Sequence, residues 1–148
     1  MKKTAFVDVI AAGFIFLFAY TAINKFLDII SLRIVLKDYP LIGNFYQWFA
    51  WGLPILEFCI VGLLLIRRTK IIGLYASLIL MSLFTLYVTY LFIFAPNMPC
   101  TCGGMLQKLS WPGHLAFNLL SILLAAVAII LHKRSKTINN KITTPVLH

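Results

Sequence analysis

The chain has 148 residues, of which 61% are hydrophobic and only 11% are charged. A water-soluble fold would lack enough polar side chains to cover its surface, so the composition predicts that lipid is the main solvent. The net charge of +9 would suit nucleic-acid binding if it formed a surface patch. The basic residues instead stand at the ends of apolar runs, as topology signals do. We therefore predict a lipid-bilayer environment and no nucleic-acid partner.

Four apolar runs are long enough to cross a bilayer. They predict an all-α integral membrane protein, a four-transmembrane-helix bundle made by residues 1–132. The expected spans are about 5–27, 48–66, 71–95 and 113–132. The first is too long for a signal-peptide core and is expected to be retained. Residues 28–47 mix charged and apolar residues, which suits an interfacial connection with a short amphipathic helix. Residues 133–148 are expected to form a basic, disordered cytoplasmic tail.

The basic residues also predict the orientation of the chain. Nine Lys and Arg residues fall on one side of the predicted spans and four on the other. The nine are Lys2, Lys3, Arg67, Arg68, Lys70, Lys133, Arg134, Lys136 and Lys141, and the four are Lys25, Arg33, Lys37 and Lys108. By the positive-inside rule both termini are cytoplasmic, in a bacterial inner (cytoplasmic) membrane. The connection between the third and fourth spans then faces outward, where disulfides persist.

That connection carries the sequence Pro99-Cys100-Thr101-Cys102-Gly103-Gly104. Two thiols separated by one residue close a small, strained ring, which favours a labile disulfide over a structural one. Closing so short a loop would give little entropic stabilisation. Three interpretations remain open: a redox dithiol, a soft-metal ligand pair, and incidental loop thiols. Met98 and Met105 lie close enough in sequence to keep the metal interpretation open.

Polar residues inside or beside the spans are further candidates. Glu57 lies well within the second span, where a carboxylate is costly unless it is paired or faces the bundle interior. A structural contact to Lys25 would be near the limit of side-chain reach, so structural and functional roles both stay open. His114 and Asn118 lie four residues apart at the start of the fourth span, with Ser121 on the same helix face. His114 could lower a thiol pKa or carry protons, or it could be an ordinary interfacial residue.

For three other features, a purely structural role is the more usual interpretation. Tyr87 and Tyr90, together with Asn118, could line a quinone pocket, although such tyrosines more often anchor a helix at the membrane interface. The charged end of the first span, which includes Lys25, is typical of a solvated or interfacial helix end. Cys59 is expected to be a small apolar core residue.

These residues resemble the MauE branch of the DoxX-like membrane proteins, a redox-associated family. The resemblance covers most of residues 5–132. The matching features are Asn24-Lys25-Phe26, Leu53-Pro54-Ile55-Leu56-Glu57 with Gly62, Cys100-Thr101-Cys102-Gly103-Gly104, Ser110-Trp111, and His114 to Asn118. The resemblance implies a four-helix bundle that acts beside a periplasmic thioredoxin-like protein and supports the maturation of a disulfide-rich subunit in methylamine utilisation. The chain lacks the second Cys pair of four-helix quinone-linked thiol oxidoreductases, which it also resembles in architecture.

The sequence thus favours a redox-associated membrane protein that exchanges thiol and disulfide equivalents with an extracytoplasmic thioredoxin-like partner. Its expected catalytic residues are Cys100, Cys102, His114 and Glu57, with a quinone as the one candidate cofactor and no resident metal. The alternatives are soft-metal binding or transport through Cys100 and Cys102, and a non-catalytic membrane assembly subunit.

Overall fold

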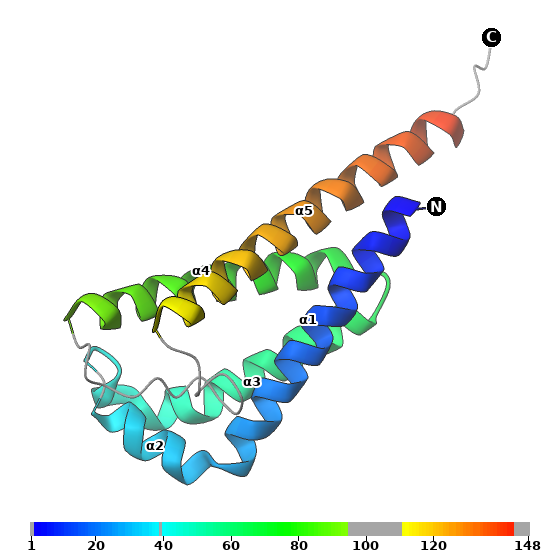
Figure 1. Ribbon diagram of the computed structural model, residues 1–148. Coiled ribbons are helices and arrows are strands. Elements are labelled where there is room, and N and C mark those ends of the chain that lie inside the picture. Colours follow the sequence, from blue (N-terminus) through cyan, green and yellow to red (C-terminus); the bar gives the residue numbers. More distant parts are fainter. Residues whose placement is uncertain (1, 39, 95–110, 144–148) are drawn as a thin grey trace.

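The computed structural model describes residues 2–38, 40–94 and 111–143 of the chain (Figure 1). Regular structure in these residues is entirely helical. The elements are α1 (Lys2–Leu27), α2 (Ile29–Lys37), the short 3-10 helix η1 (Gly43–Phe45), α3 (Tyr46–Leu65), α4 (Lys70–Phe94) and α5 (Trp111–Thr143). Four of them, α1, α3, α4 and α5, are long and apolar enough to cross a membrane. The prediction of an all-α, four-helix membrane protein is therefore confirmed.

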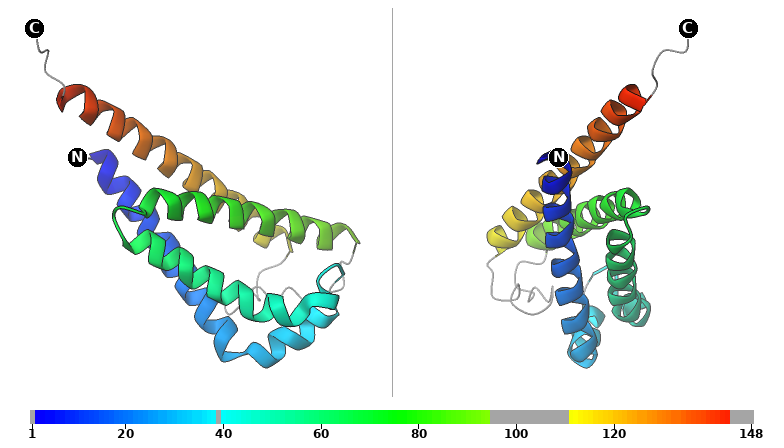
Figure 2. Two further views of the ribbon diagram at one scale, coloured as in Figure 1. Left: turned by 180° about the vertical axis from the view of Figure 1, so that it is seen from behind. Right: turned by 90° about the vertical axis from the view of Figure 1, so that its right-hand side faces the viewer.

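The four long helices form a closed ring of contacts. Helix α1 packs on α3 and α5, and α4 packs on the same two helices from the other side. Helix α2 folds back beneath the bundle and packs on α3 (Figures 1 and 2). The ring leaves one common interior that side chains from all four long helices can reach.

The interior of this bundle contains polar side chains beside an apolar core. Large apolar side chains such as Phe16, Trp48 and Leu86 are 69% to 81% exposed, as expected where lipid covers the surface. The buried polar side chains are Thr21, Lys25, Glu57, Ser77, His114, Asn118 and Ser121. Because hydrocarbon cannot satisfy polar groups, the sequence must gather them between the helices. The polar side chains that could carry out chemistry within the membrane therefore lie in the interior.

The two ends of the bundle differ in composition. The N-terminal end of α1, the turn between α3 and α4, and the C-terminal part of α5 lie at one end (Figures 1 and 2). The exposed Arg67 and Arg68 stand at this end. There Lys70 also forms an ion pair with Asp8 (Nζ to Oδ1, 2.5 Å), which places a partner beside the carboxylate near the start of the first span. Helix α2, the end of α4 and the beginning of α5 lie at the opposite end.

Helix α2 is the amphipathic helix predicted for the first connection. Leu32 and Leu36 are buried against Ala50 and Leu91, whereas Ile30 and Ile34 are exposed. The backbone leaves helical geometry at Asp28, whose φ is −121° and ψ is 45°. This break turns α2 away from the axis of α1 and allows α2 to close one end of the bundle.

Helix α5 continues to Thr143, into the segment expected to be a disordered tail from residue 133. Between residues 132 and 143 the sequence has no Gly or Pro, and Lys and Arg are good helix formers that also favour helix C-termini. The helix has 33 residues and is about 50 Å long at 1.5 Å per residue, which exceeds a hydrocarbon core of about 30 Å. Its last turns therefore project beyond the membrane-spanning part, which ends near Ser135.

A close approach between α3 and α4 yields a test of this packing. A Cβ atom added at Gly73 would lie 2.9 Å from side-chain carbons of Leu64 and 3.0 Å from its backbone nitrogen, whereas one added at Gly62 would meet nothing within 4 Å. We expect Gly73→Ala to lower the free energy of unfolding by about 1–3 kcal/mol through overpacking. Gly62→Ala should be neutral or mildly stabilising, because Ala has the higher helix propensity. Thermal unfolding in detergent compares the two variants, and equal midpoints would contradict the α3–α4 packing.

Candidate functional site

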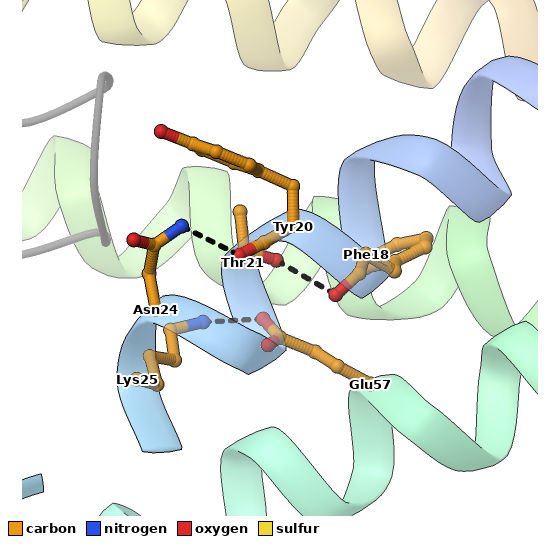
Figure 3. A network of polar contacts seen from close by, with 6 residues as sticks. All are labelled: Phe18, Tyr20, Thr21, Asn24, Lys25 and Glu57. Carbon is orange, nitrogen blue, oxygen red and sulfur yellow. Dashed lines mark hydrogen bonds and ion pairs between the residues drawn. The ribbon is translucent and has the colours of Figure 1, made fainter. Parts of the chain in front are cut away.

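The centre of the bundle contains an ion pair between Lys25 of α1 and Glu57 of α3. The Lys25 ammonium donates a hydrogen bond to Glu57 Oε1, and each residue is only 6% exposed (Figure 3). Thr21, one turn before Lys25, is also buried, and its hydroxyl donates to the carbonyl oxygen of Phe18 (3.2 Å). The two opposite charges neutralise each other where lipid or apolar side chains surround them, which is the arrangement expected of ionisable groups inside a membrane.

The sequence placed Lys25 at an interfacial helix end and near the limit of reach to Glu57. The structure shows Lys25 inside the bundle instead, on the same buried stripe of α1 as Phe14, Phe18 and Thr21. The spacing of four, three and four residues that joins these positions is the signal that could have located it. Asn24 does not join the pair, since its amide nitrogen donates to the carbonyl oxygen of Tyr20 (2.8 Å).

His114 and Asn118 bring α5 to the same centre. They are 1% and 3% exposed, and the buried stripe continues through Ser121, so the shared helix face inferred from their spacing is correct. Ser121 itself donates its hydroxyl proton to the carbonyl oxygen of Phe117 (2.9 Å). His114 and Asn118 line a cavity of about 40 Å³ together with Glu57.

We name Thr21, Lys25, Glu57, His114 and Asn118 the central polar cluster. All five line the same small cavity, which α4 closes from the other side. A volume of about 10–15 Å³ holds one water, so this cavity has room for a few waters. Two buried atoms that line it, Glu57 Oε2 and Asn118 Nδ2, have no hydrogen-bond partner among the described residues. One atom is an acceptor and the other a donor, which makes the cluster a ready binding point for water or a ligand head group.

The tyrosines of α4 stand apart from the cluster. The Tyr87 hydroxyl donates to the carbonyl oxygen of Pro40 (3.0 Å), and its ring stacks on Tyr90 with centroids 6.4 Å apart. Tyr87 lines a second, larger cavity, whereas neither cavity has Tyr90 in its described lining. The expected quinone-pocket residues are therefore divided, with Asn118 at the small cavity and Tyr87 at the large one.

Of the three cysteines, the structure describes only Cys59. Cys100 and Cys102 lie outside the described residues, and their redox and metal interpretations remain predictions. The structure describes both ends of the connection that contains them, since α4 ends at Phe94 and α5 begins at Trp111. Cys59 is a free, exposed thiol on α3. The expectation of a core position for Cys59 was wrong, because the buried stripe of α3 passes through Glu57 and Ile60 and leaves Cys59 on the lipid side.

No group of three or more His, Cys, Asp and Glu side chains able to hold a metal ion occurs within residues 2–38, 40–94 and 111–143. The central polar cluster combines a carboxylate, an ammonium group and an imidazole, which are groups that take up, release or stabilise protons. Its chemistry suits proton handling in a site shielded from bulk water.

The ion pair makes a stability prediction that separates pairing from simple burial. Glu57→Leu should destabilise the bundle by about 3–5 kcal/mol, because it leaves the Lys25 charge buried and uncompensated. The double variant Lys25→Met/Glu57→Leu should recover most of this loss, since apolar groups of similar volume often replace a buried pair without cost. Asp8→Asn serves as the control at a pair whose carboxylate is 59% exposed, and it should cost less than about 1 kcal/mol. Unfolding in detergent measures all three, and a double variant as unstable as Glu57→Leu would refute the pairing.

Comparison with known proteins assigns the chain to a family. The family model described as methylamine utilisation protein MauE matches residues 3–131, which include α1, α2, α3, α4 and the first two thirds of α5. No curated protein and no solved structure matches the chain. The match agrees with the resemblance drawn from the motifs around Lys25, Glu57 and His114. This multi-pass membrane protein belongs to the MauE family.

Proposed function

We propose that this protein exchanges thiol and disulfide equivalents with a thioredoxin-like partner outside the cytoplasm, and so supports disulfide-dependent maturation of exported proteins in methylamine utilisation. The observation that carries the proposal is the position of the central polar cluster. Two of its residues, His114 and Asn118, lie in the first two turns of α5, and α5 begins directly after the connection that contains Cys100 and Cys102. Proton-handling groups thus occur close in sequence to the dithiol that needs them.

The proposed reaction is a reversible exchange between two dithiol/disulfide pairs. A thiolate of the reduced protein attacks one sulfur of the disulfide in its partner, and that disulfide breaks as a mixed disulfide forms. The second thiol of the attacking pair then attacks the first sulfur of that pair and releases the partner's sulfur from the mixed disulfide as a thiolate. One pair ends as a disulfide and the other as a dithiol, so two electrons and two protons have moved between the proteins. The reaction requires no other oxidant.

The cluster contributes proton transfer and charge balance to this exchange. The attacking thiol must lose its proton, and the released thiolate must gain one. His114 stands twelve residues after Cys102 and lines the same cavity as the Glu57 carboxylate. In this proposal His114 exchanges protons with the thiols, Lys25 keeps Glu57 charge-balanced, and Asn118 orients the bound water or ligand.

The orientation belongs to the same proposal. The end of the bundle that holds the N-terminal end of α1 and the C-terminal part of α5 also holds Arg67 and Arg68 in the turn between α3 and α4. The positive-inside rule assigns that end to the cytoplasm. The opposite end, where α4 stops and α5 starts, then faces the outside of a bacterial inner membrane. A thioredoxin-like partner in an oxidising compartment can meet the dithiol there.

Labelling with a membrane-impermeant maleimide tests the orientation. In a Cys59→Ser background, a chain that retains one thiol of the pair, through Cys102→Ser, should react in intact spheroplasts after reduction. A matched chain without either loop thiol but with Arg68→Cys should react only after the membrane is permeabilised. Labelling in the reverse order would overturn the proposed topology.

Trapping a mixed disulfide tests the exchange itself. Cys100→Ala and Cys102→Ala, each in the Cys59→Ser background, remove the resolving thiol from one direction of attack. At least one of them should accumulate a covalent complex with a thioredoxin-like protein, visible as a gel shift that dithiothreitol reverses. The double variant Cys100→Ala/Cys102→Ala should form none and should lose the maturation of the exported substrate. Full maturation in the double variant would refute thiol exchange and favour a non-catalytic assembly role.

The metal alternative predicts a different result from the same proteins. Purified wild-type protein would contain stoichiometric copper or zinc, and the double Cys variant would contain none. The proposal of thiol exchange expects no such difference in metal content.

A further inference from the structure

A large apolar cavity occupies the space between α2, α3 and α4. Its volume is about 450 Å³, within the range of about 300–1,000 Å³ typical of small-molecule sites. Its walls include Leu32 and Leu36 of α2, Phe49 of α3, and Leu83 and Tyr87 of α4. Lys25 is the one charged residue in the described lining. The cavity is thus an apolar chamber with a single polar end.

The polar end of this chamber adjoins the small polar cavity. Both cavities share Lys25, Leu53, Leu80 and Phe84 in their linings, so the two spaces lie side by side along one wall. Behind that wall lie the central polar cluster and its two unsatisfied atoms, Glu57 Oε2 and Asn118 Nδ2. A buried polar atom without a partner is costly. A ligand head group at this wall can satisfy these atoms through waters in the small cavity.

The chamber also opens toward the surrounding lipid. Leu83, Leu56 and Leu41 line it and are 60%, 46% and 76% exposed. Exposed residues of a transmembrane bundle face acyl chains, so a lipid-soluble molecule can enter sideways without crossing water. The occupant is therefore a membrane-borne molecule with a long apolar part.

The polar wall restricts the chemistry of the head group. An anionic head would approach the Glu57 carboxylate and a cationic head the Lys25 ammonium, while the existing pair is already neutral. The free donor on Asn118 requires an oxygen acceptor, and the free acceptor on Glu57 requires a hydroxyl donor. The ring of Phe84 lies in the shared wall and offers a flat surface for stacking. A neutral, planar ring that carries oxygens meets these conditions.

We propose that the apolar chamber binds a lipid-soluble quinone, with its chain between α2, α3 and α4 and its ring beside Phe84 and Lys25. A carbonyl oxygen of the oxidised ring accepts a hydrogen bond from the Lys25 ammonium, and waters in the small cavity link the ring to Asn118 Nδ2 and Glu57 Oε2. A hydroxyl group of the reduced ring donates to the same waters, which in turn donate to Glu57 Oε2. The wall therefore holds both oxidation states.

This assignment differs from the pocket expected from the sequence. The Tyr87 hydroxyl is engaged with the carbonyl oxygen of Pro40, and Thr85 and Thr89 donate to carbonyl oxygens of their own helix (2.7 Å each). The hydroxyl groups of Thr85, Tyr87 and Thr89 are thus already satisfied. The head-group site moves to the cluster on α1, α3 and α5, while Tyr87 contributes its ring to the chamber wall.

Binding of a benzoquinone with a ten-carbon chain to the full-length protein tests the proposal. Leu83→Trp, which fills the chamber, should weaken binding at least about tenfold, equivalent to about 1.4 kcal/mol. Leu86→Trp places the same bulk on a lipid-exposed position of α4 outside the described lining, and it should leave affinity within about twofold. Asn118→Leu should weaken binding several-fold by removing one hydrogen-bond donor from the head-group site. Thermal stabilisation and photo-crosslinking of an azido-quinone measure these changes.

Two controls make the result decisive. A ten-carbon alcohol has the apolar chain and one oxygen but no ring, and it should bind at least about tenfold more weakly than the quinone, a difference of about 1.4 kcal/mol. Equal affinity for the alcohol, or no effect of Leu83→Trp, would overturn the quinone assignment. The proposal goes beyond thiol exchange and does not depend on it, so Cys100→Ser/Cys102→Ser should bind quinone normally. Loss of exchange with intact quinone binding would refute the thiol proposal alone.

Discussion

The Lys25–Glu57 ion pair is the constraint around which the bundle is arranged. Neither charge is tolerable alone inside a membrane, so α1 and α3 must bring them together wherever else they pack. The pair fixes the relative register of the two helices at a point deep in the bundle. The helix then breaks at Asp28, three residues after Lys25. If α1 continued straight, α2 would leave the bundle, and the chamber between α2, α3 and α4 would lose one wall.

Helix α3 accommodates its polar position through its own sequence. Pro54 is buried one turn before Glu57 and cannot donate the helical hydrogen bond to the carbonyl group of Ala50. Transmembrane helices tolerate such a proline where neighbouring helices surround the freed backbone group. Ala50 is fully buried and packs against α2 and Leu91. The turn of α3 that lacks this hydrogen bond is thus packed between α2 and α4.

The buried hydroxyl groups differ from the amide and carboxylate of the cluster in their hydrogen bonds. Thr21, Ser77 and Ser121 all donate to carbonyl oxygens of their own helices. Glu57 and Asn118 have no such local solution, because their side-chain atoms project from the helix into the cavity. Waters or a ligand head group in the cavity can satisfy these two atoms.

Much of the fold was predictable from the sequence, because the bilayer imposes a simple rule on it. Span length, basic ends and the mixed composition of residues 28–47 were enough to predict four long helices and a short amphipathic one. The position of Lys25 was harder to predict. A lysine near a span end normally reaches outward to water, and only its register with Phe14, Phe18 and Thr21 shows that it points inward. The chamber could not be predicted, since it depends on how α2 folds back, and one backbone break at Asp28 decides that.

The helical extension of α5 and the exposure of Cys59 show a second limit. Composition distinguishes apolar from polar segments, but it does not say where a helix stops when basic helix formers follow an apolar run. In the same way, an apolar span does not reveal which of its small residues face lipid. Cys59 lies two residues after Glu57, and this separation of about 200° on a helix directs it to the opposite face. Once Glu57 is assigned to the interior, the lipid-facing position of Cys59 follows.

The two proposals, thiol exchange and quinone binding, fit together because the electrons and protons of the two half-reactions match. Oxidation of a dithiol to a disulfide releases two electrons and two protons, and reduction of a quinone to a quinol takes up the same numbers. The central polar cluster lies between the quinone chamber, with which it shares Lys25, and the start of α5, where the chain arrives from Cys100 and Cys102. In these proposals His114 and Glu57 carry protons between the two sites. A membrane location is then useful for a physical reason: a lipid-soluble acceptor reaches its site through the bilayer, while the protein partner approaches from water.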